Sequence, residues 1–216
     1  MFKKLARCIN HFYSLDLDWE TGLVIPKSQL TTKDDRRRTK TMSEEDFNSI
    51  IDQTKESGSK AAIAFELAAR FGLRPAEAAR IKAGDIHLEH SGKRGFGQIS
   101  FTEMGRTRNI AIMTDDDRDF AQDVTEGKNP EDLLVGIKPE AIDKRLNRAM
   151  QSLYIRDKYP NVGMHSIRRL YAQKCWDEYR NEGYSVKETI VLVNKQLGLG
   201  DTRNRQLLSC YVDNMW

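Results

Sequence analysis

The sequence is poor in the features that stabilise secreted, metal-binding or membrane-spanning folds. Its three cysteines, Cys8, Cys175 and Cys210, are too few and too scattered for a disulfide framework or a zinc site. No apolar run approaches the roughly 20 residues that a membrane span needs. Residues 1–19 include basic side chains but no continuous apolar stretch, so they do not predict a signal peptide. We therefore expect a protein of the reducing cytoplasm that makes no contact with a membrane.

The chain as a whole also lacks a strong charge of one sign. Its 35 Lys and Arg exceed its 32 Asp and Glu by a net charge of +3, and this balance is usual for a globular domain with its own core. The excess is uneven, because residues 1–40 have a net charge of +4, which leaves −1 for the remainder. A basic leading segment is typical of an arm that touches a polyanion, although a solvated linker has the same composition.

Helix signals dominate the chain after residue 41. The polar stretch 31–41 indicates a linker, and Ser43, followed by acidic residues, predicts the N-cap of the helix that opens the main domain. Apolar residues at helical spacing, together with capping signals, predict further helices over 61–72, from Pro75 to about Gly84, from Pro139 onward, over 185–198 and over 202–216.

One β-hairpin is expected among these helices. Residues 95–113 contain two short apolar alternations around Met104-Gly105-Arg106, which is a hairpin pattern. The predicted fold class is therefore α+β, predominantly helical, with one small antiparallel β-sheet. A basic N-terminal arm or linker over residues 1–41 is expected to precede a single domain over residues 42–216.

The stretch GMHSIRRLYA (163–172) predicts a helix with two different faces. A buried stripe is predicted by four residues at helical spacing: Ile167, Leu170, Tyr171 and Cys175. The helical period places His165, Arg168 and Arg169 on the opposite side. Basic side chains one turn apart can bind an anion together, yet a solvated polar face is the commonest position for such residues. The stretch alone leaves both interpretations open.

Two further residues are ambiguous in the same way. Arg74 stands just before Pro75, at a predicted helix start, where free N–H groups and the helix dipole favour an anion. The alternative is an arginine paired with a nearby acid such as Glu77. Tyr211 has apolar neighbours at helical spacing, which is also the pattern of a core tyrosine.

Taken in order, these segments resemble the tyrosine recombinases, the phage-type integrase family. FGLRPAEAARIKAGDI (71–86) is similar to the first arginine motif of that family, and HSIRR (165–169) is similar to its His-x-x-Arg box. VNKQLGLG (193–200) followed by LLSCY (207–211) resembles the closing segment that carries the tyrosine. The order and approximate spacing agree over residues 42–216, so the resemblance implies that this region is a catalytic domain.

The resemblance implies a site-specific DNA recombinase or integrase that cleaves and rejoins DNA strands through a 3′-phosphotyrosine intermediate, with no cofactor or metal. Arg74 and Arg168 would clamp the non-bridging oxygens of the scissile phosphate. His165 would donate to the same oxygen or accept the tyrosine proton, and Tyr211 would be the nucleophile. Glu77 matches an acid that braces the cluster. The implied partner is double-stranded DNA, bound by a protein that is a monomer in solution and a tetramer on synapsed DNA.

Two features depart from the family pattern. The closing motif ends in Leu199, where the family has histidine or occasionally tryptophan, and leucine cannot hydrogen-bond a phosphate. The family lysine, a general acid on the hairpin, is expected near Glu103, yet no lysine lies between Lys93 and Lys128. Lys93 is therefore the candidate for this role. Arg106 is nearer in register, but a guanidinium with a pKa above about 12 is a poor proton donor.

Three interpretations remain open at this point. The first is an active recombinase, the second is a cleavage-deficient DNA-binding relative with a regulatory or accessory role, and the third is a helical structural protein whose motifs match by chance. Forty leading residues are too few for the four-helix core-binding domain of the family, so the chain is either a minimal recombinase or a fragment. Residues 1–41 are interpreted as a remnant of that domain or a substitute for it. The sequence specifies neither the DNA target nor a choice among integration, excision and inversion.

Overall fold

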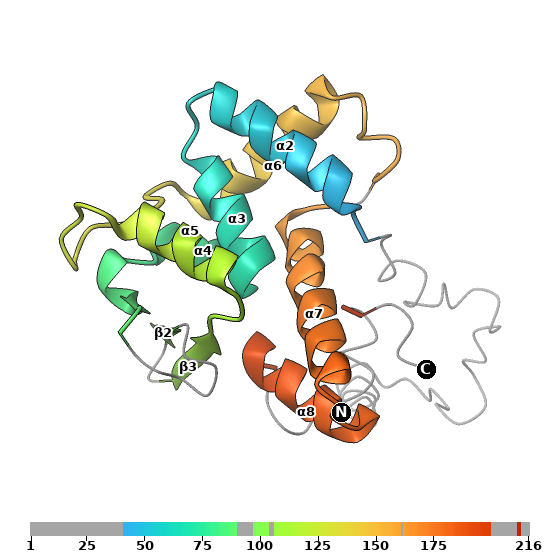
Figure 1. Ribbon diagram of the computed structural model, residues 1–216. Coiled ribbons are helices and arrows are strands. Elements are labelled where there is room, and N and C mark those ends of the chain that lie inside the picture. The colour runs from blue at the N-terminus through green and yellow to red at the C-terminus, as the bar shows by residue number, and fades with distance from the viewer. Residues whose placement is uncertain (1–40, 90–96, 104–105, 161, 200–210, 213–216) are drawn as a thin grey trace, which may run out of the picture. The chain divides into compact units, whose positions relative to one another are not determined.

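The computed structural model describes residues 41–89, 97–103, 106–160, 162–199 and 211–212 (Figure 1). These residues form seven α-helices, one short 3₁₀ helix and a three-stranded antiparallel sheet. The helices are α2 (Glu44–Glu56), α3 (Ala61–Phe71), α4 (Pro75–Arg80), α5 (Asp115–Thr125), α6 (Pro139–Ser152), α7 (Met164–Asn181) and α8 (Val186–Leu197), with the 3₁₀ helix η1 (Ala83–Asp85). The strands are β1 (Ile86–His87), β2 (Gln98–Glu103) and β3 (Arg106–Ala111). The predicted α+β class with a predominance of helix is confirmed.

Helix starts lie where local capping chemistry predicts them. The Ser43 hydroxyl accepts a hydrogen bond from the Asp46 N–H at 3.3 Å, which caps α2. Pro75 occupies the first turn of α4, a position that does not use a backbone N–H. Ser185 and Glu188 form a reciprocal capping box at the start of α8.

Two helix ends rely on glycine, and one predicted end is wrong. Gly72 and Gly198 follow α3 and α8 in the left-handed conformation, each with φ of 61°. The helix predicted from Pro75 to about Gly84 ends earlier, at Arg80, because the chain turns extended there and continues as the separate 3₁₀ helix. Most of the helix predicted over 202–216 lies outside the described residues, and the two that are described are not helical.

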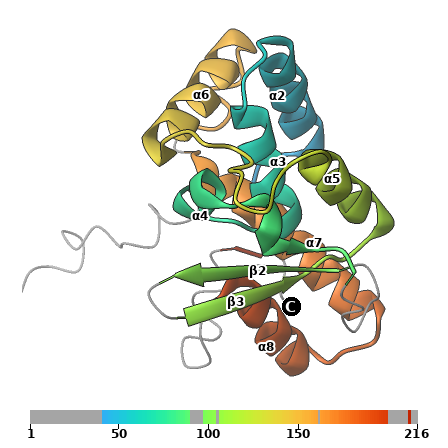
Figure 2. The same ribbon diagram turned by 90° about the vertical axis from the view of Figure 1, so that its left-hand side faces the viewer.

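The predicted hairpin is present and gives the sheet one buried face. Strands β2 and β3 pair antiparallel from Gln98 opposite Ala111 to Glu103 opposite Arg106 (Figure 2). Strand β1 adds to the other edge of β2. Phe101 and Ile110 are buried, whereas their neighbours along each strand alternate to the outside. Strand β3 packs against α8, so this face of the sheet is covered by the helix that precedes the tyrosine segment.

Helix α7 is central to the described domain and packs against α3, α6 and α8. Its predicted apolar stripe is largely confirmed, since Ile167, Tyr171 and Cys175 are fully buried. Of the two interpretations left open for the opposite side, a solvated polar face does not hold for Arg168 and Arg169, which are 1% and 5% exposed, whereas His165 is exposed. A helix that is surrounded by other helices buries residues around most of its circumference, including basic ones.

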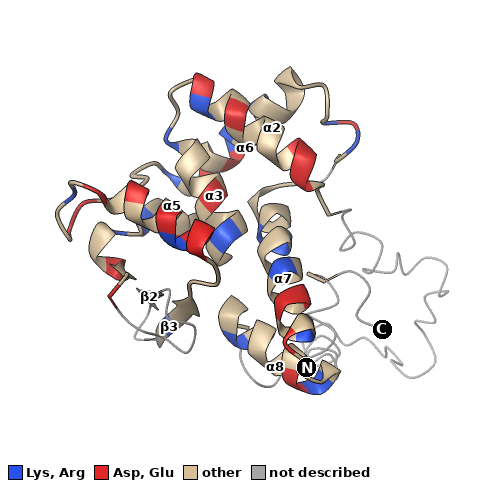
Figure 3. Cartoon of the chain, in the orientation of Figure 1, with Lys and Arg blue, Asp and Glu red and all other residues tan. Residues whose placement is uncertain are grey.

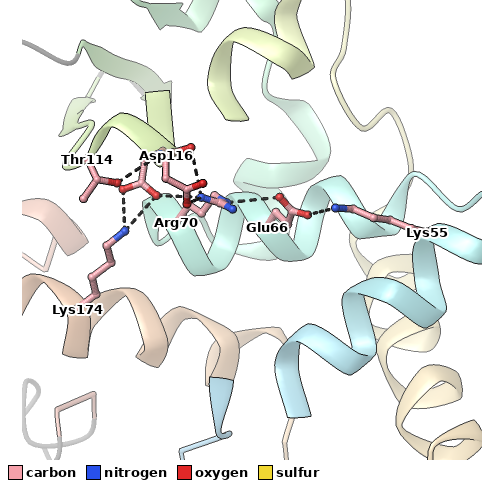
Figure 4. A network of polar contacts seen from close by, with 7 residues as sticks. Lys55, Glu66, Arg70, Thr114, Asp116 and Lys174 are labelled. Atoms are coloured by element: carbon pink, nitrogen blue, oxygen red, sulfur yellow. Dashed lines mark hydrogen bonds and ion pairs between the residues drawn. The ribbon is translucent and has the colours of Figure 1, made fainter. Parts of the chain in front are cut away.

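An ion-pair network ties four helices together (Figure 4). Lys55 of α2 lies 2.7 Å from Glu66 of α3, and Glu66 lies 3.4 Å from Arg70 one turn later. Arg70 and Lys174 of α7 both bind Asp117 of α5, a carboxylate with no exposed surface. Because a buried carboxylate requires such partners, the network fixes the packing of α5 against α3 and α7. Across the described ranges, no helix combines the length and the apolar character that crossing a membrane requires.

Candidate functional site

The first site residue, Arg74, is fixed at the start of α4 by a carboxylate. Its backbone N–H donates to Glu77 Oε2 at 2.7 Å, and its Nη1 donates to Glu77 Oε1 at 3.0 Å. Glu77 is 2% exposed, whereas the Arg74 side chain keeps 35% of its surface. The pairing with Glu77 that the sequence offered as an alternative therefore exists, but it leaves part of the Arg74 guanidinium facing solvent.

The second site residue, Arg168, reaches the same region from the second turn of α7. Its Nη2 donates to the carbonyl oxygen of Leu197, at the end of α8. Its Nε and Nη1 are buried and have no hydrogen-bond partner among the described residues. Burial, together with the positive charges of Arg108 and Arg74, lowers the pKa of Arg168 to about 10, so the side chain stays protonated near neutral pH.

A third arginine, Arg108 on β3, joins this cluster, although it stands in none of the sequence motifs that predict the site. Its Nη2 donates to Glu77 Oε2 at 2.9 Å and its Nη1 donates to the Leu197 carbonyl at 3.1 Å. The side chain is 11% exposed, and burial lowers the pKa of Arg108 although Glu77 opposes this shift. Glu77 thus binds Arg74 and Arg108, whereas Arg168 binds the Leu197 carbonyl, so one carboxylate faces three arginines and an excess of positive charge remains in a largely buried place.

His165, on the first turn of α7, lies within reach of these charges. Asp143 of α6 accepts the Met164 N–H at 3.1 Å and so fixes the start of the helix. Partial burial lowers the pKa of His165, and the positive charges of Arg168 and Arg74 lower it further. An imidazole with a lowered pKa is neutral at pH 7, and it can then accept a proton as well as donate a hydrogen bond.

Tyr211 lies beside Arg168, although 43 positions separate them in the chain. The centre of the Tyr211 ring is 5.6 Å from the Arg168 guanidinium carbon, a cation–π distance. Val212, the next residue, is buried in the core. The structure therefore brings Arg74, His165, Arg168 and Tyr211 into one neighbourhood.

The remaining predicted positions are not part of this neighbourhood as described. Lys93, the candidate general acid, lies outside the described residues. Glu103 and Arg106 are described only through their backbones, which pair at the end of the hairpin. Leu199 packs against the core and its N–H donates to Asn194 O at 3.0 Å, so its side chain brings no hydrogen-bond donor to the site.

The arrangement is suited to an anion with several oxygens. Guanidinium groups hold phosphate through charge-assisted hydrogen bonds, and buried N–H groups without partners gain most from such a ligand. Among the described residues there is no group of three His, Cys, Asp or Glu side chains that could hold a metal ion. The described part of the site therefore offers arginine, imidazole and phenol chemistry.

Comparisons with protein-family models and with curated proteins gave no match. Among solved structures, the chain is similar to a crystal structure of XerA recombinase, with 18% sequence identity and a TM-score of 0.55. That similarity covers 80% of this chain and 58% of the XerA chain, so this chain spans well under two thirds of that relative. The chain also shows a weaker similarity to an integrase from mycobacterium phage Brujita, with 15% identity and a TM-score of 0.43. This similarity covers 84% of this chain and 62% of that chain.

The likeness to XerA recombinase bears on the fold. At 18% identity two chains share an architecture, whereas the activity has to be argued from the site itself. The chain therefore has a tyrosine-recombinase-like fold, which is predominantly helical with one small antiparallel sheet, as the ordered motifs predict.

Proposed function

We propose that the protein is a site-specific DNA recombinase or integrase that cleaves and rejoins DNA strands through a 3′-phosphotyrosine on Tyr211. One observation carries this proposal. Arg168, which has two buried guanidinium nitrogens without partners among the described residues, lies beside the ring of Tyr211. The charge of Arg74, which is held by Glu77, acts on the same Arg168 side chain, although these residues are far apart in the sequence. The recombinase-like fold supports the same conclusion.

In the proposed reaction the Tyr211 oxygen attacks a DNA phosphorus, the new O–P bond forms, and the bond to the 5′-oxygen breaks. Arg74 and Arg168 bind the non-bridging oxygens, where negative charge grows in the transition state. The lowered pKa of His165 favours the neutral imidazole at pH 7 further, so it is able to accept the tyrosine proton. The leaving 5′-oxygen takes up a proton, for which Lys93 is the candidate donor.

The proposal extends to the organisation of the chain. Residues 42–216 form the catalytic domain, and residues 1–41 form a basic arm that contacts double-stranded DNA along its backbone. The protein is a monomer in solution and assembles as a tetramer on two synapsed DNA sites.

The test is the capture of a covalent protein–DNA adduct. Because the target sequence is unknown, the substrate is a pool of duplexes with randomised centres, each nicked so that the cut end diffuses away and religation fails. The wild-type protein is expected to give an adduct that survives denaturation in detergent, and Tyr211→Phe is expected to give none. Tyr184→Phe, at a half-exposed tyrosine that the proposal does not use, is the matched control. An adduct of equal yield with Tyr211→Phe would remove Tyr211 as the nucleophile.

A second candidate function is a DNA-binding relative that does not cleave. Two observations favour it: the apolar Leu199 adds no donor to the site, and the hairpin contains no lysine between residues 94 and 127. DNA binding that weakens steeply with salt, without any adduct from the randomised pool, would support this function over the first.

A further inference from the structure

Arg108 connects two parts of the site that are distant in sequence. On one side its Nη2 reaches Glu77, which is the carboxylate that also holds Arg74. On the other side its Nη1 reaches the Leu197 carbonyl, which also accepts from Arg168. A longer contact of Nη2 reaches the Gly72 carbonyl at 3.5 Å. The Glu77 and Leu197 oxygens that Arg108 contacts are therefore each shared with another arginine.

The contact with Glu77 affects how strongly Arg74 is neutralised. Glu77 Oε2 accepts both the backbone N–H of Arg74 and the Arg108 guanidinium, while Oε1 accepts the Arg74 side chain. A carboxylate that binds two guanidinium groups neutralises less of the charge of each group than a carboxylate that binds only one. Removing Arg108 would leave Glu77 to Arg74 alone and would weaken the attraction of Arg74 for a further anion.

The contact with Leu197 affects the direction of Arg168. Because Nη2 of Arg168 is committed to the end of α8, its other nitrogens have a defined orientation. Arg108 fixes that same carbonyl oxygen from the sheet side, at 3.1 Å. The end of α8 is thus held between a strand and a helix, next to the chain that continues toward Tyr211.

Gly198 provides the space through which Arg108 passes. A Cβ atom at this position would lie 2.6 Å from Arg108 Cδ, which is closer than two carbon atoms approach. The residue also has φ of +61°, a conformation that favours glycine. Any larger residue at 198 would push the Arg108 side chain out of its present path.

From these contacts we propose that Arg108 is a positioning residue of the anion site: it holds Glu77 and the end of α8 so that the neighbouring arginines keep donors for a phosphate. The identity of that phosphate as part of DNA rests on the proposed function. Arg108 itself acts through its neighbours, since both of its terminal nitrogens are already engaged by the protein.

The first measurement uses inorganic phosphate as the probe and the full chain, by titration calorimetry at constant ionic strength. Arg108→Met is expected to weaken phosphate binding by roughly tenfold or more, and Arg108→Lys by less, since lysine keeps the charge but cannot span both oxygens. Arg180→Met is the matched control, because it removes an exposed arginine of α7 that lies about 18 Å along the helix from Arg168. This control is expected to bind phosphate as the wild type does.

The second measurement is a double-mutant cycle between Arg108 and Gly198. Gly198→Ala alone is expected to weaken phosphate binding as Arg108→Met does, because both displace the guanidinium. In the Arg108→Met background, Gly198→Ala is expected to cause little further loss. If the two losses of phosphate affinity are fully additive, the two residues act independently. That result would overturn the proposal that Gly198 makes room for the Arg108 side chain.

Three outcomes distinguish the positioning role of Arg108 from a purely stabilising role and from the proposed DNA cleavage. Phosphate affinity unchanged in Arg108→Met, with only the urea midpoint lowered, would reduce Arg108 to a stabilising ion pair and overturn the proposal. A wild-type chain that binds no phosphate would overturn it as well. Phosphate binding that depends on Arg108, in a protein that forms no adduct with DNA, would support the positioning role and count against the proposed cleavage.

Discussion

Arg168 combines two properties that are costly when they occur together. It is 1% exposed, yet its Nε and Nη1 have no partner among the described residues. Burying an ion in a protein costs roughly several kcal/mol of hydration free energy, which hydrogen bonds normally offset. A buried arginine with incomplete hydrogen bonding is therefore typical of a site that a ligand completes.

Arg168→Ala tests this interpretation at the level of one side chain. We expect the single-turnover rate of adduct formation to fall by about 10²–10³-fold or more, because a donor aimed at the transition-state charge is lost. Affinity for DNA should stay within about threefold of the wild type, since many backbone contacts share the binding energy. Adduct formation on the nicked pool and filter binding measure the two quantities.

Arg168→Lys and urea unfolding are the controls for this substitution. Lysine keeps the charge but not the planar fork, so the rate should recover only in part. If affinity and rate fall by the same factor in Arg168→Ala, the side chain docks DNA and does not act on the transition state.

The site shows how far single residues can be predicted from sequence. Arg74, His165, Arg168 and Tyr211 stand in recognisable motifs, whereas Arg108 does not. The sequence does contain a signal for Arg108. In TRNIAIM it stands at every second position together with Ile110 and Ile112, so it falls on the same, apolar face as these residues. Its partners could not be predicted, because they lie 31 positions before it and 89 positions after it, beyond any local pattern.

At the scale of elements, helix ends were more predictable than helix faces. Caps depend on a few adjacent residues, and Ser43 and Gly72 act as local chemistry predicts. The face of α7 depends on what surrounds it, and α3, α6 and α8 together bury the side that carries Arg168. Periodicity identifies the most apolar face of a helix, but it does not give the number of neighbours.

The start of α2 offers a test of element packing through pH. Asp46 accepts from Lys158 and Tyr159 of the loop after α6, each at 2.5 Å. These two hydrogen bonds, that of Lys158 first, lower the pKa of Asp46 from 3.8 to about 2. A carboxylate with a lowered pKa stabilises the fold above pH 4, and this contribution is lost as the pH falls toward 2.

Asp46→Asn should therefore lower the free energy of unfolding by about 1 kcal/mol at pH 7, a value reduced for the exposure of Lys158. The difference from the wild type should narrow as the pH falls from 4 to 3, as measured by urea unfolding at each pH. Asp52→Asn, at an exposed position on the same helix, is the control. A difference that stays constant from pH 7 to pH 3 would contradict the proposed ionic tie.

At the scale of the whole molecule, charge is divided between the leading segment and the rest. Basic and acidic residues are interspersed over the described helices (Figure 3), and the chain after residue 40 has a net charge of −1. A near-neutral body exerts little long-range attraction on DNA. The net charge of +4 over residues 1–40 is therefore expected to supply most of the attraction that does not depend on DNA sequence.

Replacing Arg36, Arg37 and Arg38 together by glutamine tests this division. Each phosphate contact contributes about 0.9 to the slope of log affinity against log salt, so the slope should become shallower by up to about 3. Binding should weaken alike on all DNA sequences, as fluorescence anisotropy with two unrelated duplexes would show. The charge-matched control replaces three exposed basic residues of α6: Lys144, Arg145 and Arg148. An equal change of slope in that control would assign the effect to net charge, and a loss confined to one duplex would mean that the arginines read bases.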